Sequence, residues 1–168
     1  VYPGDTTLYD WDESDIVPFK KLPYSYNPDN GMVSSANNKT VDDDYPYYIG
    51  TWFSLPNRID RIREMLEAKE KHTVKSFQDM HSDQVSAFAR RMVPVYVDIL
   101  EGNTEGKYTA ALEQLKMWDY NMDMRIAASL IYDQMFIEMM HQLYKDELGE
   151  DIFPQILNSN IIARYHIY

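Results

Sequence analysis

Apolar residues recur every three or four positions over the second part of the chain, which is the spacing of amphipathic helices. Five helices are predicted there, over residues 58–71, 74–81, 83–100, from 109 towards 118, and 124–148. The side chains of Thr73, Thr109 and Asp123 each stand just before a helical pattern, so we expect them to cap three of these helices. Pro94 is expected to kink or end the third helix, and Gly149 to end the last.

Residues 1–56 lack this periodicity and are rich in tyrosine, proline and aspartate. Proline and glycine pairs interrupt the segment repeatedly, so it is predicted to consist of extended stretches and turns. The short apolar run from Met32 to Ala36 is predicted to be a buried strand, with a second short strand near Ile16 to Phe19. The expected fold class is therefore mainly α with a short β portion, an α+β arrangement. Residues 1–168 form one region, with an extended and strand segment at 1–56 and a helical segment at 57–168.

The composition excludes several classes of function. A length of 168 residues with 45% hydrophobic and 14% aromatic content is enough for a buried core. The formal net charge of −11 opposes binding to nucleic acid or to an anionic membrane surface. The absence of cysteine excludes disulfides, cysteine nucleophiles and thiolate metal sites. No apolar run reaches the roughly 18 residues that a membrane-spanning helix needs, so no membrane span is expected.

The residues with the most specific chemistry are Asn37, at the end of the predicted strand, and Arg58, at the start of the first helix. A fixed side-chain amide can donate a hydrogen bond to a carbonyl oxygen that becomes negative during amide hydrolysis. A guanidinium is always charged and offers several donors in a rigid fork. The alternatives are that Asn37 and Asn38 only close a turn, and that Arg58 is a surface residue of the helix. Arg61 and Arg63 are expected to be surface arginines of that kind.

The segment from Asn27 to Ile62 resembles the penicillin amidase family of N-terminal nucleophile hydrolases, which includes penicillin acylases and acyl-homoserine lactone acylases. Three features carry the resemblance: Ala36-Asn37-Asn38-Lys39, the turn Asp44-Tyr45-Pro46-Tyr47, and the helix start Arg58-Ile59-x-Arg61-Ile62. Weaker matches extend it over most of the chain, including Ile16-Val17-Pro18-Phe19 upstream and Trp118-Asp119 downstream.

The resemblance implies a four-layer αββα sandwich in the parent enzyme. It also implies an amide hydrolase of the penicillin or N-acyl amide and acyl-homoserine lactone type, with Asn37 as oxyanion donor and Arg58 as positioning residue. In the family the nucleophile is an N-terminal serine, whereas this chain begins with Val1. We therefore expect an internal fragment of the catalytic β subunit that is inactive alone. Its partners would be the α subunit, the nucleophile-bearing part of the β subunit and a small acyl amide substrate. The family further implies export to the periplasm and a role in antibiotic biosynthesis.

No cofactor is predicted with certainty, although some members of the family bind calcium near the position of Asp42-Asp43-Asp44. Calcium takes about six to eight oxygen ligands, which this acidic turn cannot supply alone. Ile49 also stands where the penicillin G acylase pattern has an aspartate ligand. The metal site is therefore unknown, and calcium remains an option only for the parent enzyme.

A second hypothesis comes from a different class of function. The chain could be a non-catalytic, acidic helical binding module, whose tyrosine-rich N-terminal arm contacts glycan or protein. His81 and Asp83 lie two residues apart, a pair that acid–base catalysis sometimes uses, but a structural role is expected for His81.

Overall fold

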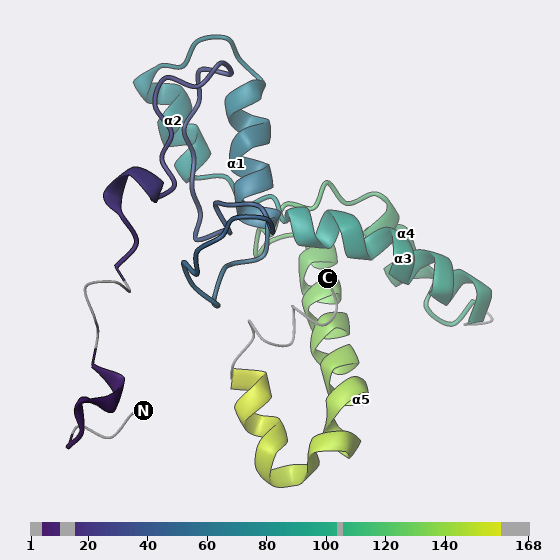
Figure 1. The fold of residues 1–168 in the computed structure, drawn as a ribbon. Coiled ribbons are helices and arrows are strands. Elements are labelled where there is room, and N and C mark those ends of the chain that lie inside the picture. Colours follow the sequence, from purple (N-terminus) through teal and green to yellow (C-terminus); the bar gives the residue numbers. More distant parts are fainter. Residues whose placement is uncertain (1–4, 11–15, 104–105, 159–168) are drawn as a thin grey trace.

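The computed structural model describes residues 5–10, 16–103 and 106–158 (Figure 1). Single-turn 3-10 helices at Thr7–Tyr9 and Phe19–Lys21 precede five α-helices in this part of the chain. The α-helices are α1 (Asn57–Glu67), α2 (Val74–His81), α3 (Ala87–Asn103), α4 (Thr109–Lys116) and α5 (Ala127–Asn158). The described residues therefore form a mainly helical fold, as the periodicity predicted.

The predicted short β portion is not seen. Neither Met32 to Ala36 nor Ile16 to Phe19 forms a strand among the described residues, and Phe19 begins a 3-10 helix instead. A strand needs a neighbouring strand to bind its backbone N–H and C=O groups. Here side-chain oxygens take two of the N–H groups, because Met32 N donates to Asn30 Oδ1 at 3.2 Å and Ala36 N donates to Asn38 Oδ1 at 3.1 Å. The prediction of a strand from an apolar run was wrong for the described residues of this chain.

The hydrophobic core lies where α3 and α5 meet the residues around the end of α4. Phe88 of α3 packs edge-to-face on Phe136 of α5, with ring centroids 5.8 Å apart. Trp118 follows α4 and packs on Tyr132, with centroids 5.6 Å apart. The buried cluster consists of Phe88, Ala89, Val93, Tyr96, Leu115, Trp118, Ala128, Tyr132, Phe136 and Met140. This cluster is the main buried core of the described residues.

Two predicted helix boundaries are confirmed by their backbone chemistry. Thr73 caps α2, since its hydroxyl accepts from Ser76 N at 3.2 Å, and Ser76 Oγ in turn accepts from Thr73 N at 2.9 Å. This reciprocal capping box satisfies two of the helix's free N–H groups. Gly149 interrupts α5 with a φ of 69°, a left-handed conformation that favours glycine, and the helix resumes beyond it.

Other boundaries differ from the prediction. Thr109 is the first residue of α4, not its cap, because its hydroxyl donates to the carbonyl of Gly106 at 2.7 Å. Asp123 binds Arg125 N in the turn before α5, which begins only at Ala127. Pro94, which was predicted to kink or end the third helix, lies inside α3 and does not end it. Short-range hydrogen bonds from side chains in the preceding turns thus accompany the observed starts of α4 and α5.

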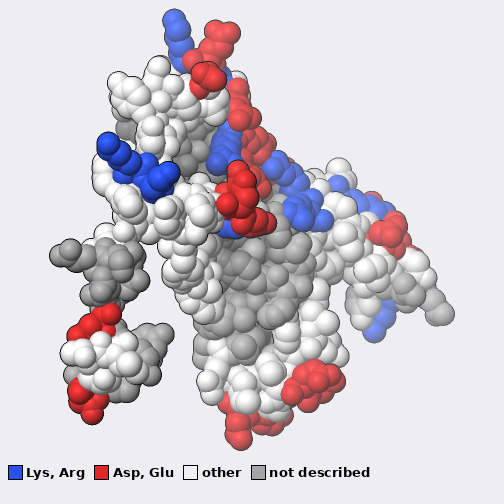
Figure 2. Space-filling model, viewed as in Figure 1, with Lys and Arg blue, Asp and Glu red and all other residues white. Residues whose placement is uncertain are grey.

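Charged side chains of both signs are interspersed on the upper part of the face shown in Figure 2, while acidic ones alone are seen at its lower end, where α5 bends. No helix in the described ranges is both long enough and apolar enough to cross a membrane.

Candidate functional site

Asn37 and Arg58 lie in direct contact although 21 residues separate them in the sequence. Nη2 of Arg58 donates to Oδ1 of Asn37 at 2.8 Å and to the backbone carbonyl of Ala36 at 2.8 Å. The same nitrogen lies 3.1 Å from Oγ of Ser54, which accepts a third, longer contact. The structure therefore brings together the two site residues that the sequence predicted.

Local backbone geometry produces this contact. Asn37 has a φ of 60°, a left-handed conformation that asparagine tolerates better than most residues. Its carbonyl accepts a hydrogen bond from Ser54 N at 2.6 Å, which ties residue 37 to the segment that leads into α1. Arg58 is the second residue of α1, so its side chain leaves the helix close to this hydrogen bond.

The Arg58 contact also sets which way the amide of Asn37 faces. A side-chain amide has an accepting oxygen and a donating NH2 group on opposite sides. Because Oδ1 receives the guanidinium, the NH2 group of this exposed side chain is turned away from Arg58. Nδ2 has no hydrogen-bond partner among the residues that the structure describes. The arrangement leaves a neutral, oriented donor at the surface of this chain.

The side-chain amide of Asn38 makes different hydrogen bonds from that of Asn37. Its Oδ1 accepts from Ala36 N at 3.1 Å, and its Nδ2 donates to the carbonyl of Lys39 at 2.8 Å. Both ends of this amide are used within the turn, so Asn38 stabilises local backbone conformation. Of the two adjacent asparagines, Asn37 is the one whose NH2 group makes no hydrogen bond to a described residue, whereas that of Asn38 binds local backbone.

The charge of Arg58 is left without a carboxylate partner in the described part of the chain. The three oxygen atoms that receive its guanidinium belong to a carbonyl, an amide and a hydroxyl, all of which are neutral. An uncompensated cation beside a donor favours negative charge on any group that binds there.

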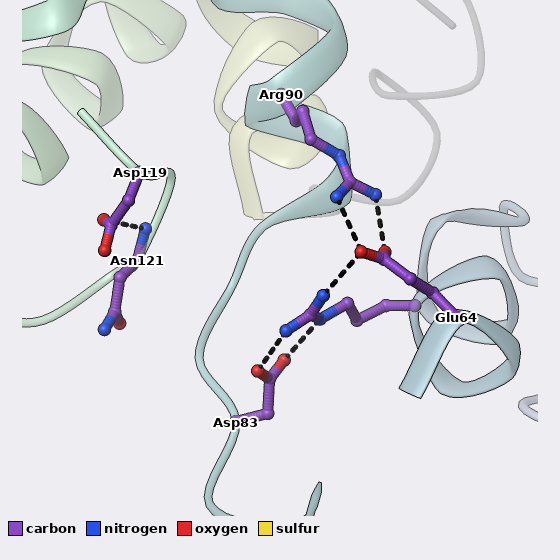
Figure 3. Close-up of polar contacts among 6 residues, drawn as sticks. Glu64, Asp83, Arg90, Asp119 and Asn121 are labelled. Atoms are coloured by element: carbon purple, nitrogen blue, oxygen red, sulfur yellow. Dashed lines mark hydrogen bonds and ion pairs between the residues drawn. The ribbon is translucent and has the colours of Figure 1, made fainter. Parts of the chain in front are cut away.

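Arg61 was expected to be an exposed arginine of the helix surface, and the structure corrects this expectation. Its guanidinium forms a bidentate pair with Asp83, Nε at 2.9 Å from Oδ2 and Nη2 at 2.6 Å from Oδ1 (Figure 3). The side chains are only 21% and 17% exposed, respectively. Sequence reasoning missed this pair because nothing in the local pattern connects residues 61 and 83.

Glu64 extends the pair into a four-residue network. It lies 2.9 Å from Nη1 of Arg61 and accepts two hydrogen bonds from Arg90 of α3, at 3.1 and 2.8 Å. These partners, Arg90 foremost, lower the pKa of Glu64 from 4.5 to about 2. Arg61 likewise lowers the pKa of Asp83. The network joins α1 to the segment before α3 and to α3 itself (Figure 3).

The lowered pKa of Glu64 predicts a specific loss of stability in acid. A carboxyl group whose pKa is lower in the folded state contributes stability above its unfolded pKa and loses it as pH falls through the folded value. The contribution of Glu64 should therefore be complete above pH 4.5 and disappear towards pH 2. Acid unfolding of the intact protein and of its Glu64→Gln variant would measure this. We expect the variant to lose less stability over that range, and equal losses would contradict the assignment.

The acidic turn does not form a metal site with the described residues. Asp43 pairs with Lys39, which lowers the pKa of Asp43, and the turn is exposed. Across residues 5–10, 16–103 and 106–158, no group of three or more histidine or acidic side chains gathers around a common point.

Open cavities lie on either side of α1. One, of about 790 Å³, is lined by residues that include Asn38, Ser54 and Arg63, but not by Asn37 or Arg58. The other, of about 410 Å³, is lined by Arg58, Arg61 and Asp83 together with apolar residues of α5. Arg58 thus borders the smaller cavity, whereas Asn37 lines neither of the two.

Comparison with known proteins gives a consistent assignment. The sequence is 25% identical over 177 aligned positions to the acyl-homoserine lactone acylase QuiP of Pseudomonas syringae pv. syringae, a match that covers 97% of this chain and 21% of the relative. It is 26% identical to the protein of the same name from Pseudomonas fluorescens, over 90% of this chain and 20% of the relative. It is 28% identical to a penicillin acylase 2 proenzyme from a Pseudomonas species, over 78% of this chain and 16% of the relative.

The chain thus spans about a fifth of the length of the curated relatives that it matches. No solved structure matches it significantly. The sequence profile of the penicillin amidase family matches residues 1–165, which is nearly the whole chain. The relatives named above are acylases. The chain therefore belongs to the penicillin amidase family.

Proposed function

We propose that this chain is part of an amidohydrolase that cleaves a carbon–nitrogen amide bond of the penicillin or N-acyl amide and acyl-homoserine lactone type. The nucleophile would be an N-terminal serine supplied by a part of the enzyme outside this chain. Asn37 would donate to the oxyanion through Nδ2, and Arg58 would hold Asn37 in position. The observation that supports this most strongly is the 2.8 Å hydrogen bond from Arg58 to Oδ1 of Asn37.

The chemistry requires the donor in that orientation. The serine hydroxyl attacks the amide carbonyl while its own α-amino group takes the proton, and the carbonyl oxygen becomes negative in the tetrahedral intermediate. A preorganised N–H donor stabilises this charge without having to reorient. The intermediate then expels the amine, which receives the proton, and water hydrolyses the resulting acyl-enzyme.

The rest of the parent enzyme would complete both the fold and the site. The parent enzyme would have an αββα sandwich, to which the described residues of this chain contribute helices. Phe19, Tyr24 and Tyr26 are more than four-fifths exposed here, and they would contact the α subunit or the remainder of the β subunit. Export to the periplasm and a role in antibiotic biosynthesis belong to the same proposal, as does any calcium site of the parent enzyme.

Substitution of Arg58 by lysine in the intact enzyme tests the proposal. Lysine keeps the charge, but its shorter, flexible side chain ends in a freely rotating ammonium. It would not hold a donor where Nη2 of Arg58 contacts Ala36, Asn37 and Ser54, so the amide of Asn37 would no longer be fixed. We expect kcat to fall roughly 10-fold to 10²-fold for a phenylacetyl anilide or an N-acyl-homoserine lactone.

Arg63→Lys provides the matched control, because Arg63 is exposed on the same helix and makes none of these contacts. Processing of the precursor must be measured for both variants, since an uncleaved precursor would be inactive for another reason. A processed Arg58→Lys enzyme with the same kcat as Arg63→Lys would refute the positioning role.

A further inference from the structure

The network of Arg61, Asp83, Glu64 and Arg90 takes no part in the proposed chemistry, yet it lies next to it. Arg58 and Arg61 are three residues apart on α1, so their side chains leave the same side of the helix one turn apart. Arg58 binds neutral oxygen atoms of residues 36 and 37, whereas Arg61 binds the carboxylates of Asp83 and Glu64. The two arginines thus connect one helix to two different parts of the chain.

Asp83 lies in a segment that is attached firmly to the hydrophobic core. Ser86 N donates to the carbonyl of Tyr120 at 2.9 Å, and Met122 N donates to the carbonyl of Gln84 at 3.0 Å. These bonds flank an antiparallel bridge between residues 85 and 121, just beyond the buried Trp118. The carboxylate of Asp83 is therefore a fixed point relative to the core.

α1 itself is held by little apolar burial. Ile59, at 2% exposure, is its buried residue, and the other apolar side chains of its inner side, Ile62, Met65 and Leu66, are only half-buried. A helix with so few buried side chains can rotate or slide by a fraction of a turn at small cost. A bidentate arginine–carboxylate pair restricts both movements, because two parallel hydrogen bonds fix direction as well as distance.

We propose that the Arg61–Asp83 pair is a positioning element that sets α1 against the core, so that Arg58 reaches and orients Asn37. This inference rests on the proposed function, because it assigns the pair a role in catalysis that is exerted only through Arg58. Arg61 and Asp83 touch no substrate. Without the pair, α1 keeps its helical structure but Arg58 loses its register with residues 36 and 37.

The test uses Asp83→Asn in the intact, processed enzyme, with a phenylacetyl anilide and an N-acyl-homoserine lactone as probe substrates. Misplacement of a positioning group by about 1 Å costs up to 10²-fold, so we expect kcat to fall roughly 10-fold to 10²-fold with KM nearly unchanged. In an Arg58→Lys background the same change should lower kcat little further, because residues that act through one another are not additive. This non-additivity is the readout that a purely structural pair would not give.

Asp79→Asn is the matched control, since Asp79 is an exposed carboxylate of α2 that pairs with Lys75 of the same helix. It should leave kcat unchanged. If Arg58→Lys lowers kcat but Asp83→Asn does not, or if their effects multiply, the positioning role is wrong and the proposed function stands. If Arg58→Lys has normal kcat, the positioning role of Arg58 in the proposed function fails, a result distinct from failure of Asp83→Asn alone.

Arg61→Lys covers the case in which Asp83→Asn does not fold. Lysine retains the charge and one hydrogen bond to Asp83 while losing the bidentate geometry. A folded, processed Arg61→Lys enzyme with reduced kcat supports the proposal. Loss of folding in both variants overturns it and leaves the pair with a structural role alone.

Discussion

Replacing Asn37 by alanine in the intact enzyme is expected to lower kcat about 10²–10³-fold, which corresponds to roughly 3–4 kcal/mol of transition-state stabilisation. The reason is the loss of Nδ2, the donor that Arg58 turns outward by binding Oδ1. KM should change much less, because the oxyanion exists only in the transition state and the tetrahedral intermediate. Steady-state kinetics on processed enzyme with a phenylacetyl anilide would measure the effect.

Two variants separate the lost donor from other consequences of the substitution. Alanine is strained at the φ of 60° that residue 37 adopts, whereas Asn37→Gly removes the donor without that strain. Equal losses of kcat in both variants would assign the effect to the amide. Asn38→Ala should keep most of its activity, since both ends of that amide bind local backbone. Normal kcat in processed Asn37→Gly, together with a large loss in Asn38→Ala, would show that the wrong asparagine was chosen.

Replacing Trp118 by alanine is expected to destabilise the protein by about 3–5 kcal/mol, the usual cost of truncating a buried tryptophan. Trp118 is 5% exposed, and its indole N–H donates to the carbonyl of Asn121 at 2.9 Å. Its ring also packs on Tyr120 and Tyr132, so the substitution removes contacts on two sides. Thermal unfolding of the intact protein, followed by far-UV circular dichroism, should show a midpoint several degrees lower.

Trp118→Phe provides the graded comparison for this effect. Phenylalanine retains most of the buried aromatic surface but leaves the carbonyl of Asn121 without its indole donor. We expect its midpoint to lie between those of the wild type and Trp118→Ala. An alanine variant as stable as the wild type would show that the cluster around Trp118 is not the core of this segment.

Helical periodicity predicted the helices well because it depends on local sequence and on which face is buried. The start of α2 at Thr73 and the interruption at Gly149 were both visible as capping chemistry. The start of α4 was misplaced because Thr109 turns its hydroxyl back to Gly106. Pro94 did not end α3, since helices tolerate an internal proline when tertiary packing outweighs the lost hydrogen bond.

Contacts between distant residues were predictable only where a family resemblance supplied them. The resemblance singled out Asn37 and Arg58, and these two are in contact, although their catalytic roles stay a prediction. Nothing pointed to the pairing of Arg61 with Asp83 across 22 positions. The strand at residues 32–36 failed for a related reason, because pairing depends on a partner strand that local sequence does not contain.

The left-handed backbone at Asn37 has a consequence for which residues position 37 can hold. Two independent requirements apply there: the main chain admits mainly glycine, asparagine and aspartate, and the proposed role at the oxyanion requires an N–H donor. Glycine tolerates the left-handed main chain but has no side-chain donor, and aspartate tolerates it but offers only acceptors. Glutamine and serine carry donors but fit the main chain poorly. Among the short side chains asparagine alone meets both requirements. Every other residue at position 37 is therefore expected to lower either the stability of this turn or the activity.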